Sequence, residues 1–587
     1  MIQALIEKID RQENITTDEL KHVIRRINGI RRVIDERLRK ERETLRELEI
    51  EEENRLLALH IERLDEIEQE FEPDAWQELY DINDIPEDKR SYRGLIEYLS
   101  SKIPTMKKEN RVSVFIPARL EGKNIYRTLE EYTRQQDLQG KPLDPNLYEI
   151  VIFVNRKNGE ERDNTLLEIE RFEQNNPQYN IHVFELVLPK DLARVGFCRR
   201  VLTDVILYRA SQRKEKDGLL YLITEDADLE KVDPQIVAKT IERFEKYPHL
   251  DALRGIQLRN PETLSQCPPL WLERYVSDVA ELLSMHQRGF PEDWYYYGEW
   301  PDPFSWGRII TGGWATSFKA STLAEIGGYD PKLKVGEDLF IGNAISVLRS
   351  KENDDQGNPR PNLDTIKTMS IRHVSSPRRF LSILMGIGGY ERFGESEIEK
   401  LIRTTPPEEL ISMINRAFGE NPKQNITKIL NFNIFRLFSV TRNLEEGKRR
   451  SEILLQLFCL RKERDYRWKS EARIENGKIV PGEIELTDNG VNKIRFLFEI
   501  FRYGIEKLGV EEVIRRKIGL WPIIAGFKSL PKEGEFKDKF EIIERIRMLM
   551  NLSEDINESA VISQFLSLPE EEKKNLVENL FRQKYGG

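Results

Sequence analysis

The fold class is predicted mainly from one stretch of the sequence, Gly218-Leu-Leu-Tyr-Leu-Ile-Thr-Glu-Asp-Ala-Asp228. Their first half is a continuous apolar run after a glycine, which is typical of a strand buried on both faces of a parallel sheet. Ligands bind beyond the carboxyl ends of such strands, where Asp226 and Asp228 follow in this chain. Two carboxylates at this spacing can share a hard divalent cation, Mn²⁺ or Mg²⁺, although the same pattern also occurs in helix caps and solvated turns.

Three similar apolar runs precede this strand, and a helical pattern follows each of them. The runs cover residues 112–117, 148–155 and 181–187, and the helical patterns cover residues 124–135, 163–175 and 197–213. Strands that alternate with helices of this length indicate βαβ units. We therefore expect an α/β fold with a mostly parallel central sheet flanked by helices.

The chain divides into four segments of different composition. Residues 1–75 carry apolar residues at helical spacing among many charges, which predicts a long helix or helical hairpin. This segment would be either a solvated spacer or a dimerising coiled coil, which could make a homo-oligomer. Residues 76–110 read as a connector, and residues 111–400 as the α/β domain. Residues 401–587 predict a mainly helical domain with a short hairpin near 472–486, because Asn476-Gly477 favours a tight turn.

The composition argues against several classes of protein. The chain has 587 residues, of which 33% are charged, and its net charge of −10 disfavours general binding to nucleic acid. Cys198, Cys267 and Cys459 have neither a disulfide nor a zinc spacing, so a reducing, cytoplasmic compartment fits best. The first residues lack the pattern of a signal peptide, and no run of about 18 apolar residues predicts a membrane span.

Three glycine-containing or acidic motifs follow the DxD pair in a fixed order. They are Ile310-Thr-Gly-Gly-Trp-Ala-Thr-Ser-Phe-Lys319, Glu325-Ile-Gly-Gly-Tyr-Asp330 and Val335-Gly-Glu-Asp-Leu339. With the DxD pair, this ordered set resembles the family 2 glycosyltransferases, which have a GT-A fold. The resemblance spans roughly residues 111 to 380, about half of the chain. It implies a metal-dependent enzyme that moves a sugar from a nucleotide-diphosphate donor to a carbohydrate or small hydroxyl acceptor.

On the donor side, the resemblance gives a role to individual residues. Asp226 and Asp228 match the metal-binding DxD motif, and Asn155 stands where the family often has an aspartate that contacts the base. Arg199 lies in a looser match to the segment near the sugar nucleotide. The first nucleotide-binding strand and its turn are matched by Pro117, Ala118, Arg119 and Glu121.

The catalytic motif of the family is matched by Gly336-Glu337-Asp338. Asp338 would be the base that takes the proton of the acceptor hydroxyl in an inverting transfer, and Glu337 would bind or orient the acceptor. Both residues could instead only cap the helix that follows. His373 stands where some metal-dependent GT-A enzymes have an additional ligand, and it could equally be a structural histidine.

An aromatic segment lies between the metal motif and the base motif, where acceptor loops belong in this fold. Trp300, Trp306 and Trp314 offer apolar ring faces to the C–H groups of a sugar. Gly312 and Gly313 match the glycine-containing acceptor segment of the family. A packed lid or core element accounts for these aromatic residues equally well.

The sequence leaves three alternatives to an inverting glycosyltransferase. A retaining GT-A transferase would use the same metal site. A nucleotidyltransferase is disfavoured, because the turn after the first strand has one glycine, Gly122, and no Gly-rich loop. A non-catalytic helical assembly protein with a degenerate transferase domain would use the long helical ends instead.

Overall fold

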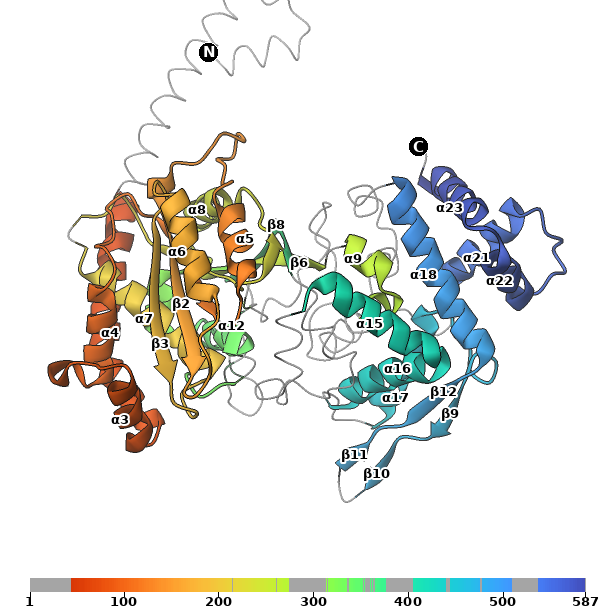
Figure 1. Ribbon diagram of the computed structural model, residues 1–587, viewed down its shortest axis with the longest axis horizontal. Coiled ribbons are helices and arrows are strands. Elements are labelled where there is room, and N and C mark those ends of the chain that lie inside the picture. The colour runs from red at the N-terminus through yellow and green to blue at the C-terminus, as the bar shows by residue number, and fades with distance from the viewer. Residues whose placement is uncertain are drawn as a thin grey trace, which may run out of the picture.

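The structure is a computed structural model that describes residues 44–213, 215–259, 261–273, 313, 315–334, 337–351, 353, 359, 362, 365–375, 405–439, 444–475, 478–508 and 537–585. Figure 1 shows an α/β part, which contains the large sheet, and a mainly helical part formed by the C-terminal third of the chain. Among the described residues, no helix combines the length and the apolar character needed to cross a bilayer.

A sheet of eight strands forms the centre of the α/β part, in the order β3-β2-β1-β4-β7-β6-β8-β5. The strands are β1 (Val112–Ala118), β2 (Tyr148–Lys157), β3 (Ile181–Leu188), β4 (Tyr221–Thr224), β5 (Leu229–Lys231), β6 (Ala252–Arg259), β7 (Thr316–Lys319) and β8 (Ile366–Ser375). Strands β3, β2, β1 and β4 are parallel neighbours, and β6 is parallel to β8. Strand β7 runs antiparallel to β4 and β6, and β5 runs antiparallel to β8. The predicted mostly parallel sheet is confirmed.

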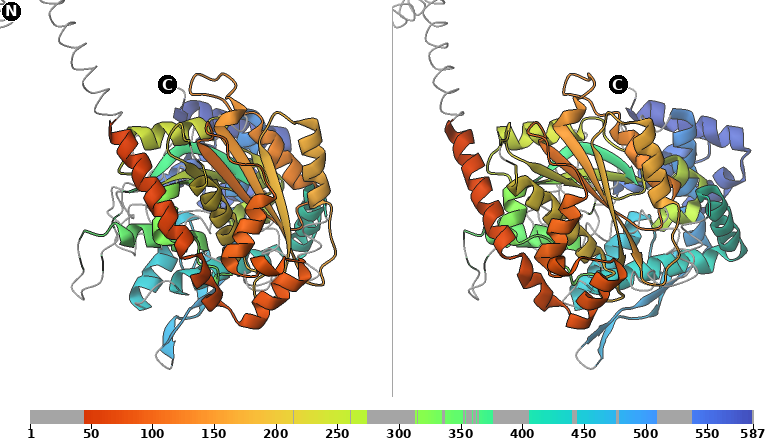
Figure 2. Two further views of the ribbon diagram at one scale, coloured as in Figure 1. Left: turned by 90° about the vertical axis from the view of Figure 1, so that its left-hand side faces the viewer. Right: turned by 60° about the vertical axis from the view of Figure 1, so that its left-hand side comes forward.

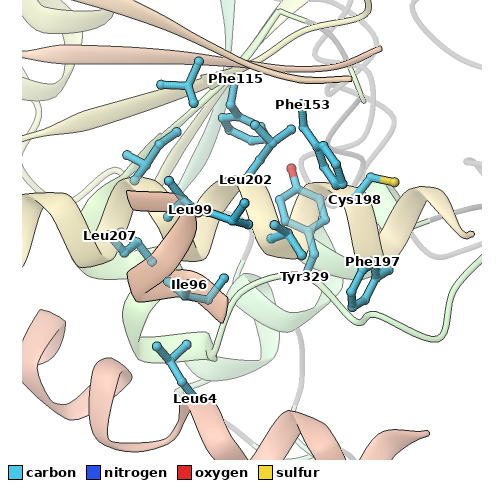
Figure 3. Packing of buried hydrophobic residues seen from close by; sticks show 14 of the residues in the cluster. Leu64, Ile96, Leu99, Phe115, Phe153, Phe197, Cys198, Leu202, Leu207 and Tyr329 are labelled. Carbon is cyan, nitrogen blue, oxygen red and sulfur yellow. The ribbon is translucent and has the colours of Figure 1, made fainter. Parts of the chain in front are cut away.

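Helices cover both faces of this sheet, as Figure 2 shows. One layer consists of α5 (Lys123–Tyr132), α6 (Thr165–Asn175) and α8 (Ile236–Lys246). The other consists of α4 (Tyr92–Ser101), α7 (Val195–Ser211), α11 (Ala320–Ile326) and α12 (Glu337–Leu348). Side chains alternate along a strand, so Val114 and Ile116 of β1 pack in the first layer and Phe115 packs in the second. Figure 3 shows Phe115 and Phe153 of the sheet near Leu202 of α7 and Tyr329.

The residues before β1 belong to the same core as the sheet. Residues 44–62 are helical and are followed by η1 (Leu64–Glu70), α3 (Pro73–Ile82), η2 (Glu87–Lys89) and α4. The expected connector at 76–110 therefore contains two α-helices, whose apolar faces join the core around α7. The predicted helix and coiled coil at residues 1–43 lie outside the described residues.

Two buried polar side chains fix the helix of residues 44–62 to the α/β part. Glu53 accepts hydrogen bonds from the Leu220 backbone N–H and from Lys216 Nζ, each at 3.0 Å. His60 Nε2 lies 2.8 Å from Asp204 Oδ1 of α7. Buried polar groups are stable only with such partners, so this helix is part of the folded core and not a solvated spacer.

The C-terminal part is mainly helical, as the sequence predicts. Its helices are α15 (Pro407–Glu420), α16 (Pro422–Ser439), α17 (Leu444–Leu457), α18 (Asp488–Leu508), α21 (Lys537–Leu549), α22 (Glu558–Ser567) and α23 (Glu570–Tyr585). The predicted hairpin is β10 (Arg473–Glu475) paired with β11 (Lys478–Val480), and β9 (Tyr466–Ser470) pairs with β12 (Glu483–Leu486). Leu264 of α9 (Pro261–Gln266) and the following Trp271 pack into this helical core. The exact domain boundaries stay a prediction.

Candidate active site

The end of β4 carries the acidic residues that the sequence singles out. Thr224 and Glu225 are fully buried, whereas Asp226 and Asp228 are half-buried. Strand β4 ends beside β1 and β7 at the carboxyl edge of the parallel strands. This is the edge at which α/β sheets bind ligands, so the two aspartates have the position that the sequence predicts for them.

Arg199 of α7 joins this strand end to two segments that are distant in sequence. Its Nε donates to Glu337 Oε1 at 3.0 Å, and its Nη2 donates to Asp226 Oδ1 at 3.1 Å and to the Gly313 carbonyl at 2.8 Å. Its Nη1 donates to the Thr224 hydroxyl. The guanidinium is buried and uses all three nitrogens on protein partners. Burial alone would lower its pKa, but the negative charge of Glu337 and its neighbours raises the pKa overall.

Gly313 allows this close approach because it has no side chain. A Cβ at this position would lie 2.6 Å from Arg199 Nη2. The Gly313 backbone N–H donates to Asp338 Oδ2 at 3.0 Å while its carbonyl accepts from Arg199. The predicted acceptor segment and the predicted base motif therefore meet at this glycine.

Glu337 and Asp338 form the first turn of α12, where the helix dipole stabilises negative charge. Glu337 is buried and Asp338 is half-buried. Burial raises the pKa of Glu337; Arg199 opposes the rise, the charge of Asp338 adds to it, and the result lies above the ordinary value. The pair thus contains one carboxyl held by Arg199 and one, Asp338, oriented by a backbone N–H.

Glu225 lies at the same strand end as the two aspartates, and the sequence analysis did not single it out. Its Oε1 accepts from the Tyr132 hydroxyl at 2.8 Å, and its Oε2 accepts from the Ala315 N–H at 3.1 Å. His373 Nδ1 of β8 lies 3.2 Å from the same Oε1, and both side chains are fully buried. Glu225 therefore connects α5, β4, β8 and the segment after Gly313. The sequence did offer one signal for Glu225, since a carboxylate directly after a buried strand needs hydrogen-bond partners in the folded protein.

The residues predicted for a metal are only partly brought together. Asp226 and Asp228 follow the same strand, but His373 packs against Glu225. In the described part of the chain, no three His, Cys, Asp or Glu side chains form a cluster able to hold a metal ion. Two carboxylates still fit Mg²⁺ or Mn²⁺, which take remaining ligands from water and substrate phosphate. The role of His373 as a third ligand stays a prediction.

The residues predicted to bind the donor lie at the turn after β1 and at the end of β2, beside a small hollow. Pro117 and Ala118 end β1, and Glu121 donates its backbone N–H to Thr165 Oγ1 at 2.9 Å. Arg119 forms two hydrogen bonds with Glu160, at 3.1 and 2.7 Å. Asn155 is 9% exposed, and its Nδ2 donates to the Ala118 carbonyl at 3.1 Å.

This hollow is small, with a cavity volume of about 10 Å³, which is room for roughly one water molecule. It is lined by Leu120, Val154, Asn155, Arg156, Glu161, Arg162, Asp163, Leu166 and Glu185. The predicted acceptor residues Gly312, Trp300, Trp306 and Trp314 lie outside the described residues.

Comparisons with known proteins give distant likenesses. No family model and no curated protein sequence matches the chain. Among solved structures, the mannosyltransferase PcManGT from Pyrobaculum calidifontis, in complex with GDP-Man and Mn²⁺, is 13% identical. The match covers 62% of this chain and 81% of that one, with a TM-score of 0.29. Glucosyl-3-phosphoglycerate synthase from Mycobacterium tuberculosis is 14% identical over 55% of this chain and 84% of that one, with a TM-score of 0.26. At these TM-scores the function has to be argued from the site itself.

Proposed function

We propose that this protein is a divalent-metal-dependent glycosyltransferase of the GT-A type. It moves a sugar from a nucleotide-diphosphate donor to an acceptor hydroxyl, with inversion and with Asp338 as the general base. The observation that carries the proposal is the set of hydrogen bonds around Arg199. They bring Asp226 of the DxD motif, Gly313 of the acceptor segment and Glu337 of the base motif to one guanidinium.

The chemistry of an inverting transfer matches what these residues offer. The acceptor oxygen forms a bond to the anomeric carbon, the bond from that carbon to the diphosphate oxygen breaks, and the hydroxyl proton goes to a carboxylate. Asp338 takes this proton, because it is half-buried at the site and the Gly313 N–H orients its carboxylate. Glu337 is held by Arg199, and its role would be to bind or orient the acceptor beside Asp338.

Asp226 and Asp228 would hold the divalent cation, which would neutralise the charge that develops on the departing diphosphate. Asn155, at the end of β2, would form a hydrogen bond with the nucleobase. A half-buried position for both aspartates suits this role, because a metal that binds substrate phosphate must keep some of its coordination positions open.

A donor screen tests the proposal. The protein is incubated with UDP-, GDP- and ADP-sugars and Mn²⁺ or Mg²⁺, and release of nucleoside diphosphate is measured with and without EDTA. We expect slow, metal-dependent hydrolysis of one donor, and its loss in Asp228→Asn. The matched control is Asp217→Asn, an exposed aspartate in the loop before β4, which should keep the activity.

Two outcomes would replace the proposal. A product that retains the anomeric configuration, read by NMR, would favour the retaining alternative and remove the base role of Asp338. Failure of every nucleotide and every donor to bind or react would favour the non-catalytic helical assembly protein.

A further inference from the structure

The side chain of Glu225 divides its two carboxylate oxygens between the scaffold and the acceptor segment that contains Gly313 and Ala315. Oε1 binds the scaffold: it accepts from the Tyr132 hydroxyl of α5 at 2.8 Å, and His373 Nδ1 of β8 lies 3.2 Å from it. Burial and the charge of Glu225 hold the pKa of Tyr132 well above its ordinary value, so the hydroxyl stays a donor. Oε2 accepts instead from the Ala315 backbone N–H at 3.1 Å. The fully buried carboxylate thus joins the scaffold to one backbone group of the acceptor segment.

Ala315 has a backbone conformation that needs such support. Its φ is 44°, in the left-handed region, where a residue with a Cβ is strained. Both of its backbone polar groups are bound, the N–H to Glu225 and the carbonyl to the Gly255 N–H of β6 at 2.7 Å. The residue after it, Thr316, pairs with Thr224 at the end of β4. Strained residues of this kind persist only where their surroundings fix them, and they cluster at functional sites.

The strained residue lies two positions after Gly313, which contacts the proposed base. The Gly313 N–H donates to Asp338 Oδ2 at 3.0 Å, and the Gly313 carbonyl accepts from Arg199 Nη2 at 2.8 Å. A glycine restricts its own backbone little, so the direction of its N–H depends on how the neighbouring chain is held. Arg199 holds the Gly313 carbonyl, and Glu225 holds the chain at Ala315.

We propose that Glu225 is a positioning residue for the sugar transfer: it fixes the backbone between Gly313 and Ala315 and thereby keeps the Asp338 carboxylate in the orientation that takes the acceptor proton. The inference rests on the proposed function, because Asp338 is a base only in that reaction. Glu225 itself contacts neither donor nor metal, since its carboxylate is fully buried and both oxygens have protein partners. Misplacement of a reacting group by about 1 Å can cost about a hundredfold in rate, which sets the size of the expected effect.

Hydrogen–deuterium exchange of the full chain, read by mass spectrometry, tests the positioning without any substrate. In Glu225→Ala we expect the Ala315 amide to exchange about tenfold faster, because its hydrogen bond to a charged group is lost. The amides of β1 serve as the internal reference for general loosening of the sheet. Tyr132→Phe is the matched control: it removes a hydrogen bond from Oε1 and leaves the bond from Ala315 to Oε2, so exchange at Ala315 should not change.

Kinetics form the second arm of the test, with donor hydrolysis as the reaction and water in the place of the acceptor. Glu225→Ala should lower kcat about a hundredfold. The KM for the donor should stay unchanged, because Asp226 keeps its hydrogen bond with Arg199. Glu225→Gln should recover most of the lost kcat, because its amide oxygen can still accept from the Ala315 N–H. Tyr132→Phe should keep the original kcat.

Glu225→Asp is the second variant in case Glu225→Ala does not fold. It keeps the buried charge, but its shorter side chain withdraws the oxygen from Ala315, so we expect faster exchange and a lower kcat here too. Unchanged exchange at Ala315 in these variants would overturn the proposal, and so would a loss of kcat as large in Glu225→Gln as in Glu225→Ala. A raised donor KM with unchanged kcat would also overturn it, by giving Glu225 a role in donor binding.

Failure of the proposed function gives a different result. The original chain would then release nucleoside diphosphate from no donor. Faster exchange at Ala315 in Glu225→Ala would in that case leave Glu225 as a structural residue of the acceptor segment, without a role in transfer.

Discussion

Arg199 donates to Glu337 at 3.0 Å although the two residues lie 138 positions apart in the chain. This contact ties the N-terminal half of α7 to the first turn of α12. The negative partners of Arg199 are themselves buried or half-buried, so the guanidinium compensates charges that would otherwise be poorly solvated. The site is therefore held together by one cation.

Replacement of Arg199 by methionine should destabilise the protein strongly. The change removes the positive charge that Glu337 and Asp226 share, and loss of one partner of a buried ion pair typically costs about 3–5 kcal/mol. Urea denaturation followed by circular dichroism measures the effect. The control is Arg55→Met, because Arg55 forms a pair with Glu52 in which both side chains are exposed, and its loss should change the stability little. Equal midpoints for the two variants would show that Arg199 is not the organising group.

Asp338→Asn should abolish sugar transfer without loss of the fold. Asparagine keeps an oxygen that can accept from the Gly313 N–H, but it cannot take a proton from the acceptor, and removal of a general base typically costs about 10²- to 10⁴-fold in rate. The rate is measured with the donor found in the screen, and nucleotide affinity is measured by calorimetry on the same sample. A variant that transfers sugar at the original rate would disprove the base role.

Glu149 should govern part of the acid stability of the α/β part. Burial alone would raise its pKa, but the hydrogen bond with His182 and the charge of Arg209 lower it from 4.5 to about 2. The folded pKa lies below the unfolded one, so ionised Glu149 stabilises the fold above pH 4.5, and this contribution is lost as pH falls from 4.5 towards 2. The shift corresponds to about 3 kcal/mol.

The Glu149→Gln variant should therefore unfold at a lower urea concentration than the original chain at pH 7. Between about pH 5 and pH 3 it should lose less stability than the original chain, because it has no carboxylate at this position to protonate. The comparison uses Glu170→Gln, which changes an exposed carboxylate on α6 and should retain the original acid dependence. An unaltered pH dependence in the Glu149 variant would contradict the prediction.

Lys493→Met should destabilise the C-terminal part. Lys493 Nζ donates to Asp465 Oδ2 at 2.6 Å and to the Cys459 carbonyl at 2.8 Å, and it lies 2.6 Å from Glu558 Oε1. Its removal takes the nearer of two cations from the buried Asp465, because Arg464 lies 4.0 Å away, and the cost should be about 3–5 kcal/mol. Thermal unfolding checks this, with Lys448→Met on α17 as the control for a more exposed pair. A melting temperature unchanged from that of the original chain would show that the buried lysine contributes nothing.

Much of the fold could be predicted because β1 to β4 are continuous apolar runs separated by helical patterns. Strand β7 (Thr316–Lys319) was not expected as a strand, because its short polar sequence carries no clear period. It lies in the middle of the sheet because β4 and β6 pair with it on either side. Tertiary context of this kind is invisible in a local pattern.

The candidate site, like the fold, could be predicted where a local motif marks its residues and could not where distant segments meet. The residues of the DxD, glycine and base motifs could be named from their order, and Gly313, Asp226 and Glu337 do meet at Arg199. Arg199 was expected near the sugar nucleotide, and its four protein partners could not be foreseen, since they are far apart in sequence. Glu225 was missed for the same reason: Tyr132 and Ala315 reach it only after the sheet has formed.

The helix of residues 44–62 finds its buried partners late in the synthesis of the chain. Leu220 lies 167 positions beyond Glu53, and Asp204 lies 144 positions beyond His60. At about 5–20 residues per second, the ribosome needs on the order of 10 seconds or more to produce these partners. During that interval Leu57 and Ile61, which are buried in the finished protein, lack the α7 side of the core to which they belong. Part of this apolar helix face thus stays uncovered while the chain is being made, and we expect a holding chaperone that covers it to raise the yield of folded protein.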